Sequence, residues 1–184
     1  QIQEVSELVA GAYAAHARNA AKYCMVTATR GPGPKEMDTI CDAVRQIKEK
    51  LDIDICVSLG LLTAEQSATL AAAGVDRVNH NLETSERYYA EVCNTHTFHD
   101  RLETVRNVKA AGMEACCGGI MGMGETETDR VDMALTLREL GVESIPVNFM
   151  DPRPGTPLGD VPRLSPIDCL KSLCMFRFTN PTRD

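Results

Sequence analysis

Soft thiols and carboxamides recur on or just after the short apolar segments of this 184-residue chain. The residues concerned are Cys24, Cys56, Asn79, Asn81, Cys116, Cys117 and Asn148. Buried parallel strands with a purely structural role consist mostly of Val, Ile and Leu. Polar or soft residues on every such segment therefore favour a lined cavity. The alternative is that small cysteines fill the layers of a barrel interior.

Three thiols from different strands that point at one volume would suit an iron–sulfur cluster, because thiolates are soft donors. Zinc is the competing metal, although zinc sites usually draw on closely spaced ligand pairs and the chain has no Cys-x2-Cys. Spacing alone leaves both metals open. The chain is too long and too regular for a disulfide scaffold. Structural roles are expected for the cysteines in helical or loop sequence, which are Cys41, Cys93, Cys169 and Cys174.

A glycine-rich turn and a polar strand are the other candidates. Gly118 to Glu125 reads Gly-Gly-Ile-Met-Gly-Met-Gly-Glu, so a ligand could approach its backbone and the following helix N-terminus. A plain tight turn is the alternative. Asn79 and Asn81 share a strand face and can recognise amides, ureas or ribose hydroxyls, and Glu83 could accept from a ribose diol. The intervening His80 is expected to face away.

Five short strands, each followed by a helix, would position these residues. The strands are expected at residues 23–29, 54–59, 77–82, 114–120 and 143–148. The helices are expected at 3–20, along the apolar stripe of 40–51, at 63–74, 98–112 and 125–140, and from 165 onward. Strict alternation implies parallel strands with right-handed crossovers. A doubly wound sheet and a (β/α)8 barrel both fit, and both gather function at the carboxyl ends of strands.

The composition is ordinary for a globular protein, with 43% apolar residues, 24% charged residues and a net charge of −7. No basic run suggests nucleic acid, no apolar stretch suggests a membrane span, and no secretory signal is visible. We therefore expect a cytoplasmic protein. No shift in composition marks a domain boundary, and both ends look interrupted. Residues 1–184 are thus expected to form a single partial domain, truncated at both ends.

The chain resembles the biotin synthase family of radical S-adenosylmethionine enzymes. The matching stretches follow one another along nearly the whole chain, and together they are specific. They are Tyr-Cys-Met at 23–25, Cys56 to Gly60, Asn-His-Asn-Leu-Glu-Thr-Ser at 79–85, Cys-Cys-Gly-Gly-Ile-Met-Gly-Met-Gly-Glu at 116–125, and Asn148 to Leu158.

The resemblance implies a (β/α)8 TIM-type barrel, incomplete, with about five or six βα units present. It implies a [2Fe-2S] cluster inside the barrel, held by Cys24, Cys56 and Cys116, with Cys117 as the alternative to Cys116. It implies a [4Fe-4S] cluster near the barrel mouth. S-adenosylmethionine would contact Asn81, Glu83, Arg101, Gly122 and Glu125. The substrate dethiobiotin would contact Asn79, Asn81 and Asn148.

The implied activity is that of a sulfurtransferase. A radical generated from S-adenosylmethionine would activate two carbons of dethiobiotin, and the inner cluster would provide the sulfur. An electron-donor protein and a homodimer are the implied partners.

Two family features are missing from the sequence. The Cys-x3-Cys-x2-Cys loop of the [4Fe-4S] cluster would precede the first helix, and the arginine ligand of the inner cluster would follow Asp184. The 184 residues alone are therefore expected not to turn over. A related radical enzyme, of the iminoacetate synthase or hydrogenase-maturase type, and a non-radical barrel that binds a metal or small molecule are the alternative functions.

Overall fold

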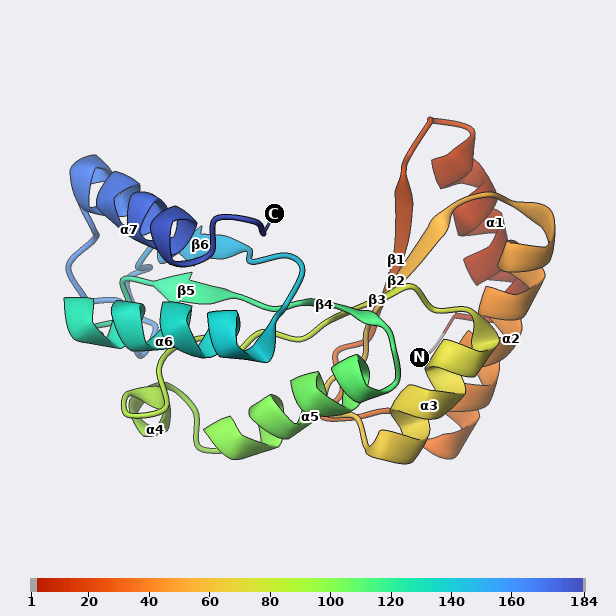
Figure 1. Ribbon diagram of the computed structural model, residues 1–184, viewed down its shortest axis with the longest axis horizontal. Coiled ribbons are helices and arrows are strands. Elements are labelled where there is room, and N and C mark those ends of the chain that lie inside the picture. The colour runs from red at the N-terminus through yellow and green to blue at the C-terminus, as the bar shows by residue number, and fades with distance from the viewer. Residues whose placement is uncertain (1–2, 184) are drawn as a thin grey trace. The chain divides into compact units, whose positions relative to one another are not determined.

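A computed structural model describes residues 3–183 (Figure 1). The chain forms two compact units. The first runs to His80 and includes Glu103–Ala115, and the second comprises Asn81–Leu102 and continues from Cys116. The expected single partial domain stays a prediction. Within the described residues, no helix combines the length and apolar character needed to cross a membrane.

The first unit is built on a four-stranded sheet in the order β1-β2-β3-β4. The strands are β1 (Lys22–Val26), β2 (Asp54–Ser58), β3 (Arg77–Asn79) and β4 (Glu114–Cys116). The β1–β2 and β2–β3 pairs are parallel, and Cys24 is the register partner of Cys56. Parallel strands that follow one another through helices are what the alternation of the sequence predicts.

Three helices, α1 (Val5–His16), α2 (Pro34–Lys50) and α3 (Ala64–Ala73), lie on the same side of the β1–β2 pair (Figure 1). The predicted stripe of α2 is buried in this core, with Ile40, Val44 and Ile47 at most 2% exposed. From the sheet, Ile55 and Val57 are fully buried. Because side chains alternate along a strand, Cys56 lies between them on the opposite face of β2.

The ends of α3 are where the sequence predicts them. Thr63 and Gln66 form a reciprocal capping box at its start, with each side chain accepting a backbone N–H of the other residue. At its end, Gly74 adopts a left-handed conformation with φ of 104°.

The second unit contains a parallel pair of strands, β5 (Gly119–Met121) and β6 (Val147–Phe149), in which Ile120 is the register partner of Asn148. Its helices are the short α4 (Tyr89–Val92), α6 (Glu127–Leu140) and α7 (Pro166–Thr179). Helix α5 (Phe98–Ala110) begins in this unit and ends in the first. Helices α6 and α7 contact one another, and their shared core includes Met133, Leu137 and Phe176.

Four strand predictions need correction. The strand expected at 114–120 is two strands, and the strand expected at 77–82 ends at Asn79. The strand expected at 23–29 ends at Val26, and the strand expected at 143–148 begins only at Val147. The first break has a clear cause, because the Gly118 N–H donates to the Asn81 side-chain Oδ1 at 3.1 Å rather than to a neighbouring strand. The described residues therefore hold six strands and not five, and α4 was not predicted.

A buried carboxylate fixes the start of α6. Asp129 accepts hydrogen bonds from the Ser85 hydroxyl at 2.7 Å, from the Arg87 guanidinium at 2.8 Å and from the Thr126 backbone N–H at 2.8 Å. Burial disfavours the charge of Asp129, but these hydrogen bonds outweigh it and hold the pKa of the carboxyl well below its usual range. The segment after β3 is thereby tied to the helix that follows the glycine-rich turn.

Replacing Asp129 by Ala is expected to lower the free energy of unfolding by about 3 kcal/mol, because Ser85, Arg87 and Thr126 all lose an acceptor. Denaturant titration followed by circular dichroism measures this loss. The matched control is Asp132→Ala, which removes only an exposed ion pair with Arg87 and should cost about 0.5 kcal/mol or less. Equal losses in both variants would contradict the assignment.

The lowered pKa of Asp129 makes the stability of the protein depend on pH. Its folded-state pKa is lowered, so its stabilisation is fully present above the unfolded value of about 4 and is lost as the pH falls through the folded value. The wild-type protein should therefore lose stability in acid, and the Asp129→Ala variant should lose less over the same range.

Candidate functional site

Two of the three predicted cluster ligands lie side by side in the first unit. Cys24 on β1 and Cys56 on β2 are register partners and form a side-chain hydrogen bond. Met25 and Val57, the next register pair, are buried, so the two cysteines lie on the other face of the sheet. A pair of soft thiols in register fits two ligand positions of an iron–sulfur cluster.

The environment of this pair favours the uncharged thiol. The hydrogen bond with Cys24 and burial raise the pKa of the Cys56 thiol well above its usual range. No disulfide links the cysteines of the described chain. Within residues 3–183, no three side chains of His, Cys, Asp or Glu are gathered closely enough to hold a metal ion. That Cys116 completes the ligand set stays a prediction.

Cys24 also lines a cavity of about 440 Å³ in the first unit. The walls come from α1 with Leu8, from residues 24–29 of β1 and its following loop, and from α2 with Glu36 and Ile40. Of the predicted soft and polar strand residues, only Cys24 lines this cavity, so the predicted cavity shared by all the strands stays a prediction.

The polar strand shows the alternation that the sequence predicts. Asn79, Asn81 and Glu83 are partly exposed, whereas the residues between them are buried. His80 is only 7% exposed, which confirms that it faces away from its two Asn neighbours. The three polar residues therefore occupy alternate positions in the sequence. Asn79 ends β3 in the first unit, and Asn81 and Glu83 begin the second unit.

In the second unit, Asn81 and Glu83 contact one another and are held by two further residues, Gly118 and Arg101. The Asn81 Oδ1 accepts from the Gly118 N–H, and the Asn81 side chain also hydrogen-bonds Glu83. Arg101 donates to the Asn81 carbonyl oxygen at 2.8 Å and lies 3.5 Å from Glu83 Oε1. These contacts bring three of the predicted cofactor-binding residues, Asn81, Glu83 and Arg101, into one cluster.

Glu83 has an unpartnered side-chain oxygen and an unusual backbone conformation. Its Oε2 is buried and has no hydrogen-bond partner among the described residues, and its backbone has a φ of 72°. Burial raises the pKa of this carboxyl more than the Arg101 charge and the Asn81 hydrogen bond lower it. An acceptor oxygen without a donor fits a ligand that brings hydroxyl groups, such as a ribose diol.

The glycine-rich turn is close-packed as well as flexible. A Cβ on Gly118 would collide with the Pro146 carbonyl, and a Cβ on Gly119 would collide with the Glu83 carbonyl. Gly122 has a φ of 92°, which a residue with a side chain rarely adopts.

The carboxylate of Glu125 is fully engaged by its own surroundings. It accepts from the Gly122 N–H at 2.7 Å, the Met123 N–H at 2.8 Å and Arg130 Nε at 2.7 Å. Its side chain is 1% exposed. Glu125 therefore shapes the turn, and its predicted contact with a cofactor stays a prediction.

Cys116 and Cys117 differ sharply in accessibility. Cys117 is fully buried, and burial raises the pKa of its thiol to about 12. Cys116 is partly exposed and its backbone bridges to Ser144. This difference supports Cys116 as the ligand of the pair. Asn148, the predicted substrate contact of β6, is exposed beside Ile120 on β5.

Two sequence models of known families match the chain. The sequence model of the radical SAM superfamily matches residues 1–137. The chain belongs to the radical SAM superfamily. A second model, the Biotin and Thiamin Synthesis associated domain, matches residues 146–184.

The curated relatives of the chain include two biotin synthases. The chain is 58% identical over 183 residues to the biotin synthase of Salinibacter ruber, and the aligned region covers 100% of this chain and 51% of that protein. It is 52% identical over 177 residues to the biotin synthase of Rhodopirellula baltica, with 96% of this chain and 49% of that protein covered. The chain thus spans about half the length of the curated relatives it matches.

Solved structures establish the fold. Methylornithine synthase superposes on the whole chain with a TM-score of 0.80 at 19% identity, covering 56% of its own length. The FeFe-hydrogenase maturase HydG from Carboxydothermus hydrogenoformans also superposes on the whole chain, with a TM-score of 0.80 at 18% identity and 45% of its own length. The predicted α/β fold of the radical SAM barrel type is confirmed.

The sequence reasoning missed one cluster in this radical SAM protein. Cys93, read as structural, lies 3.5 Å from the Thr95 hydroxyl and 3.8 Å from His96 Nδ1. Burial opposes its charged form, but hydrogen bonds from Thr95, Tyr89 and His96 outweigh it and lower the pKa of the thiol to about 7. The signal was present, since a Cys-x-Thr-His run places donors within one turn of the thiol.

The pH dependence of the alkylation rate should distinguish Cys93 from Cys117. Because its pKa is lowered, half of Cys93 is thiolate near pH 7, so its reaction with iodoacetamide should rise through pH 7 and level off near pH 8. Cys117, whose pKa is raised to about 12, should stay unlabelled. Peptide mapping by mass spectrometry gives both rates. In the Thr95→Val variant the Cys93 profile should move to higher pH, and an unmoved profile would contradict the assigned donor.

Proposed function

We propose that this chain belongs to a biotin synthase, which inserts sulfur into dethiobiotin with S-adenosylmethionine and iron–sulfur clusters. The observation that carries the proposal is similarity to biotin synthases at 47 to 58% identity over 95 to 100% of the chain. The thiol pair of Cys24 and Cys56 in the first unit and the polar cluster around Glu83 in the second unit support the proposal.

The cysteines would hold the inner cluster. Cys24 and Cys56 provide two thiols in register, and the partly exposed Cys116 provides the third. When bound, a [4Fe-4S] cluster supplies the electron that cleaves S-adenosylmethionine, and a [2Fe-2S] cluster supplies the sulfur. Since burial and the mutual hydrogen bond hold Cys56 in its thiol form, metal binding at this pair releases protons.

The second unit's polar cluster would bind S-adenosylmethionine. The open Oε2 of Glu83 can accept from the ribose hydroxyls, while Arg101, already against Glu83 and the Asn81 carbonyl, can meet the carboxylate of the methionyl group. Gly122 keeps the turn beside this cluster in its positive-φ conformation, with Leu164 packed where a Cβ would lie. These groups orient the cofactor and exclude water from it.

Carboxamides would recognise dethiobiotin. Its ureido ring is neutral and both donates and accepts hydrogen bonds, which Asn side chains match. Asn79 on β3 and Asn148 on β6 are partly or fully exposed. Asn81 uses Oδ1 for Gly118 and one N–H for Glu83, which leaves one N–H to donate to a ligand. An electron-donor protein and a second copy of the chain are the proposed partners.

The rival functions are weaker. Membership in the radical SAM superfamily counts against a non-radical barrel. A hydrogenase-maturase or other radical function rests on likenesses near 18% identity, which concern the fold alone. Anaerobic reconstitution of the protein from its complete gene, followed by a test for biotin formation from dethiobiotin, decides between them. Cleavage of S-adenosylmethionine without biotin formation would favour a rival.

Replacing Cys56 by Ala is expected to remove the inner cluster, with a loss of about two iron atoms per chain and of the [2Fe-2S] absorption. Iron and sulfide analysis after anaerobic reconstitution measures this. The matched control is Cys41→Ala, at a buried thiol of α2 that no proposed ligand contacts, and it should keep the full iron content. Normal [2Fe-2S] absorption in Cys56→Ala would refute the ligand assignment.

A further inference from the structure

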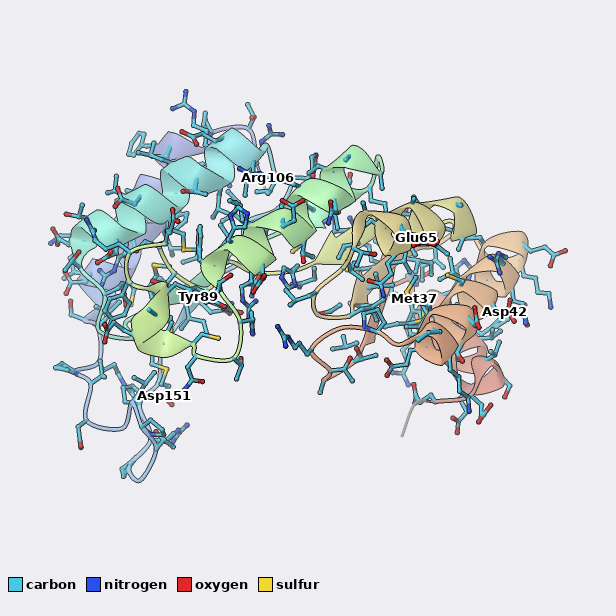
Figure 2. The ribbon with its side chains drawn as sticks, turned by 90° about the horizontal axis from the view of Figure 1, so that it is seen from below. Met37, Asp42, Glu65, Tyr89, Arg106 and Asp151 are labelled. Atoms are coloured by element: carbon cyan, nitrogen blue, oxygen red, sulfur yellow. The ribbon has the colours of Figure 1, made fainter. Side chains whose placement is uncertain are left out.

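Tyr89 occupies a position that the proposed function does not use. It is the first residue of α4, the short light-green helix beside which it is labelled in Figure 2. The side chain is buried, at 3% exposure. Its ring meets the ring of Phe98 edge to face, with centroids 5.8 Å apart and planes at 69°, and that of His96 in the same manner at 6.2 Å and 62°. These contacts fix the plane of the ring.

The hydroxyl of Tyr89 holds one edge of Arg101. Arg101 Nε donates to Tyr89 Oη at 2.7 Å, and the guanidinium carbon lies 5.9 Å from the ring centroid. Arg101 Nη1 donates to the Asn81 carbonyl and lies beside Glu83 Oε1. Because the guanidinium is a rigid planar fork, fixing its Nε edge also fixes the edge that faces Asn81 and Glu83.

A second contact sets the direction of the hydroxyl. Since Arg101 donates into Oη, the proton of the phenol is available to the Cys93 sulfur, with which Tyr89 hydrogen-bonds. Burial and Cys93 raise the pKa of Tyr89 to about 12 against the opposing effect of Arg101. The phenol therefore keeps its proton at neutral pH and can accept from Arg101 while donating to Cys93.

We propose that Tyr89 is a positioning residue of the S-adenosylmethionine site, acting through Arg101 to hold the guanidinium against Asn81 and Glu83. The inference rests on the proposed function, because that function assigns Glu83 and Arg101 to the cofactor. Tyr89 does not touch the cofactor. It restricts the rotation of the Arg101 side chain in the unliganded protein. Binding of the cofactor therefore does not include the entropic cost of ordering this side chain.

The variant Tyr89→Phe tests the proposal, since it keeps the ring contacts and removes the acceptor of Arg101 Nε. In the full-length, anaerobically reconstituted protein, the Kd for S-adenosylmethionine should rise about tenfold. Equilibrium dialysis with labelled S-adenosylmethionine measures it without turnover. Arg101→Lys should weaken binding further. The double variant should bind no more weakly than Arg101→Lys alone, because Tyr89 acts through Arg101.

The control is Tyr13→Phe, at an exposed tyrosine of α1 outside the site, and its Kd should equal that of the wild type. The proposal is overturned if Tyr89→Phe binds like the wild type or if the losses of the single variants add in the double variant. A fall in Tm or in iron content that parallels the binding loss would show a merely structural role and also overturns it. A wild-type protein that does not bind S-adenosylmethionine sinks the proposed function itself.

Discussion

The closeness of three backbone segments underlies the site of the second unit. Residues 81–83, 118–120 and 146–148 are in direct main-chain contact, through Glu83 and Gly119 on one side and Gly118 and Pro146 on the other. No Cβ fits at Gly118 or Gly119. The two glycines are therefore required by sterics before any ligand is considered, and the positions of Asn81, Glu83 and Asn148 follow from their fit.

The acidic side chains around this contact divide into two kinds. Asp129 and Glu125 are buried and fully hydrogen-bonded, and each fixes a helix start or a turn. Glu83 keeps one buried oxygen without a partner. A native protein pairs nearly all of its buried polar atoms, and this unpartnered oxygen supports the proposal that Glu83 binds a ligand. Sequence alone gave Glu83 and Glu125 similar roles, and only their partners separate them.

Helices were predictable because their signals are local. The stripe of α2, the capping box of α3 and the glycine that ends it each lie within a few residues. The parallel pairing of β1 with β2 followed from strict alternation of strands and helices, whereas the register of Cys24 with Cys56 did not. Strand ends were less predictable, because the break before β5 depends on Asn81, a side chain 37 residues from Gly118. The contact of Tyr89 with Arg101 likewise depends on the brief helix α4, which has no periodic pattern.

The left-handed backbone of Glu83 sets a limit on how this protein can change. A residue with a side chain costs roughly 1 kcal/mol more than glycine in that conformation, so glycine at position 83 would relieve the strain. It would also remove the buried carboxylate oxygen that has no partner among the described residues. At position 83, glycine would thus favour stability, whereas glutamate would favour the proposed ligand recognition. Selection for heat tolerance alone would tend to erase the site here, while selection for binding would preserve the strain.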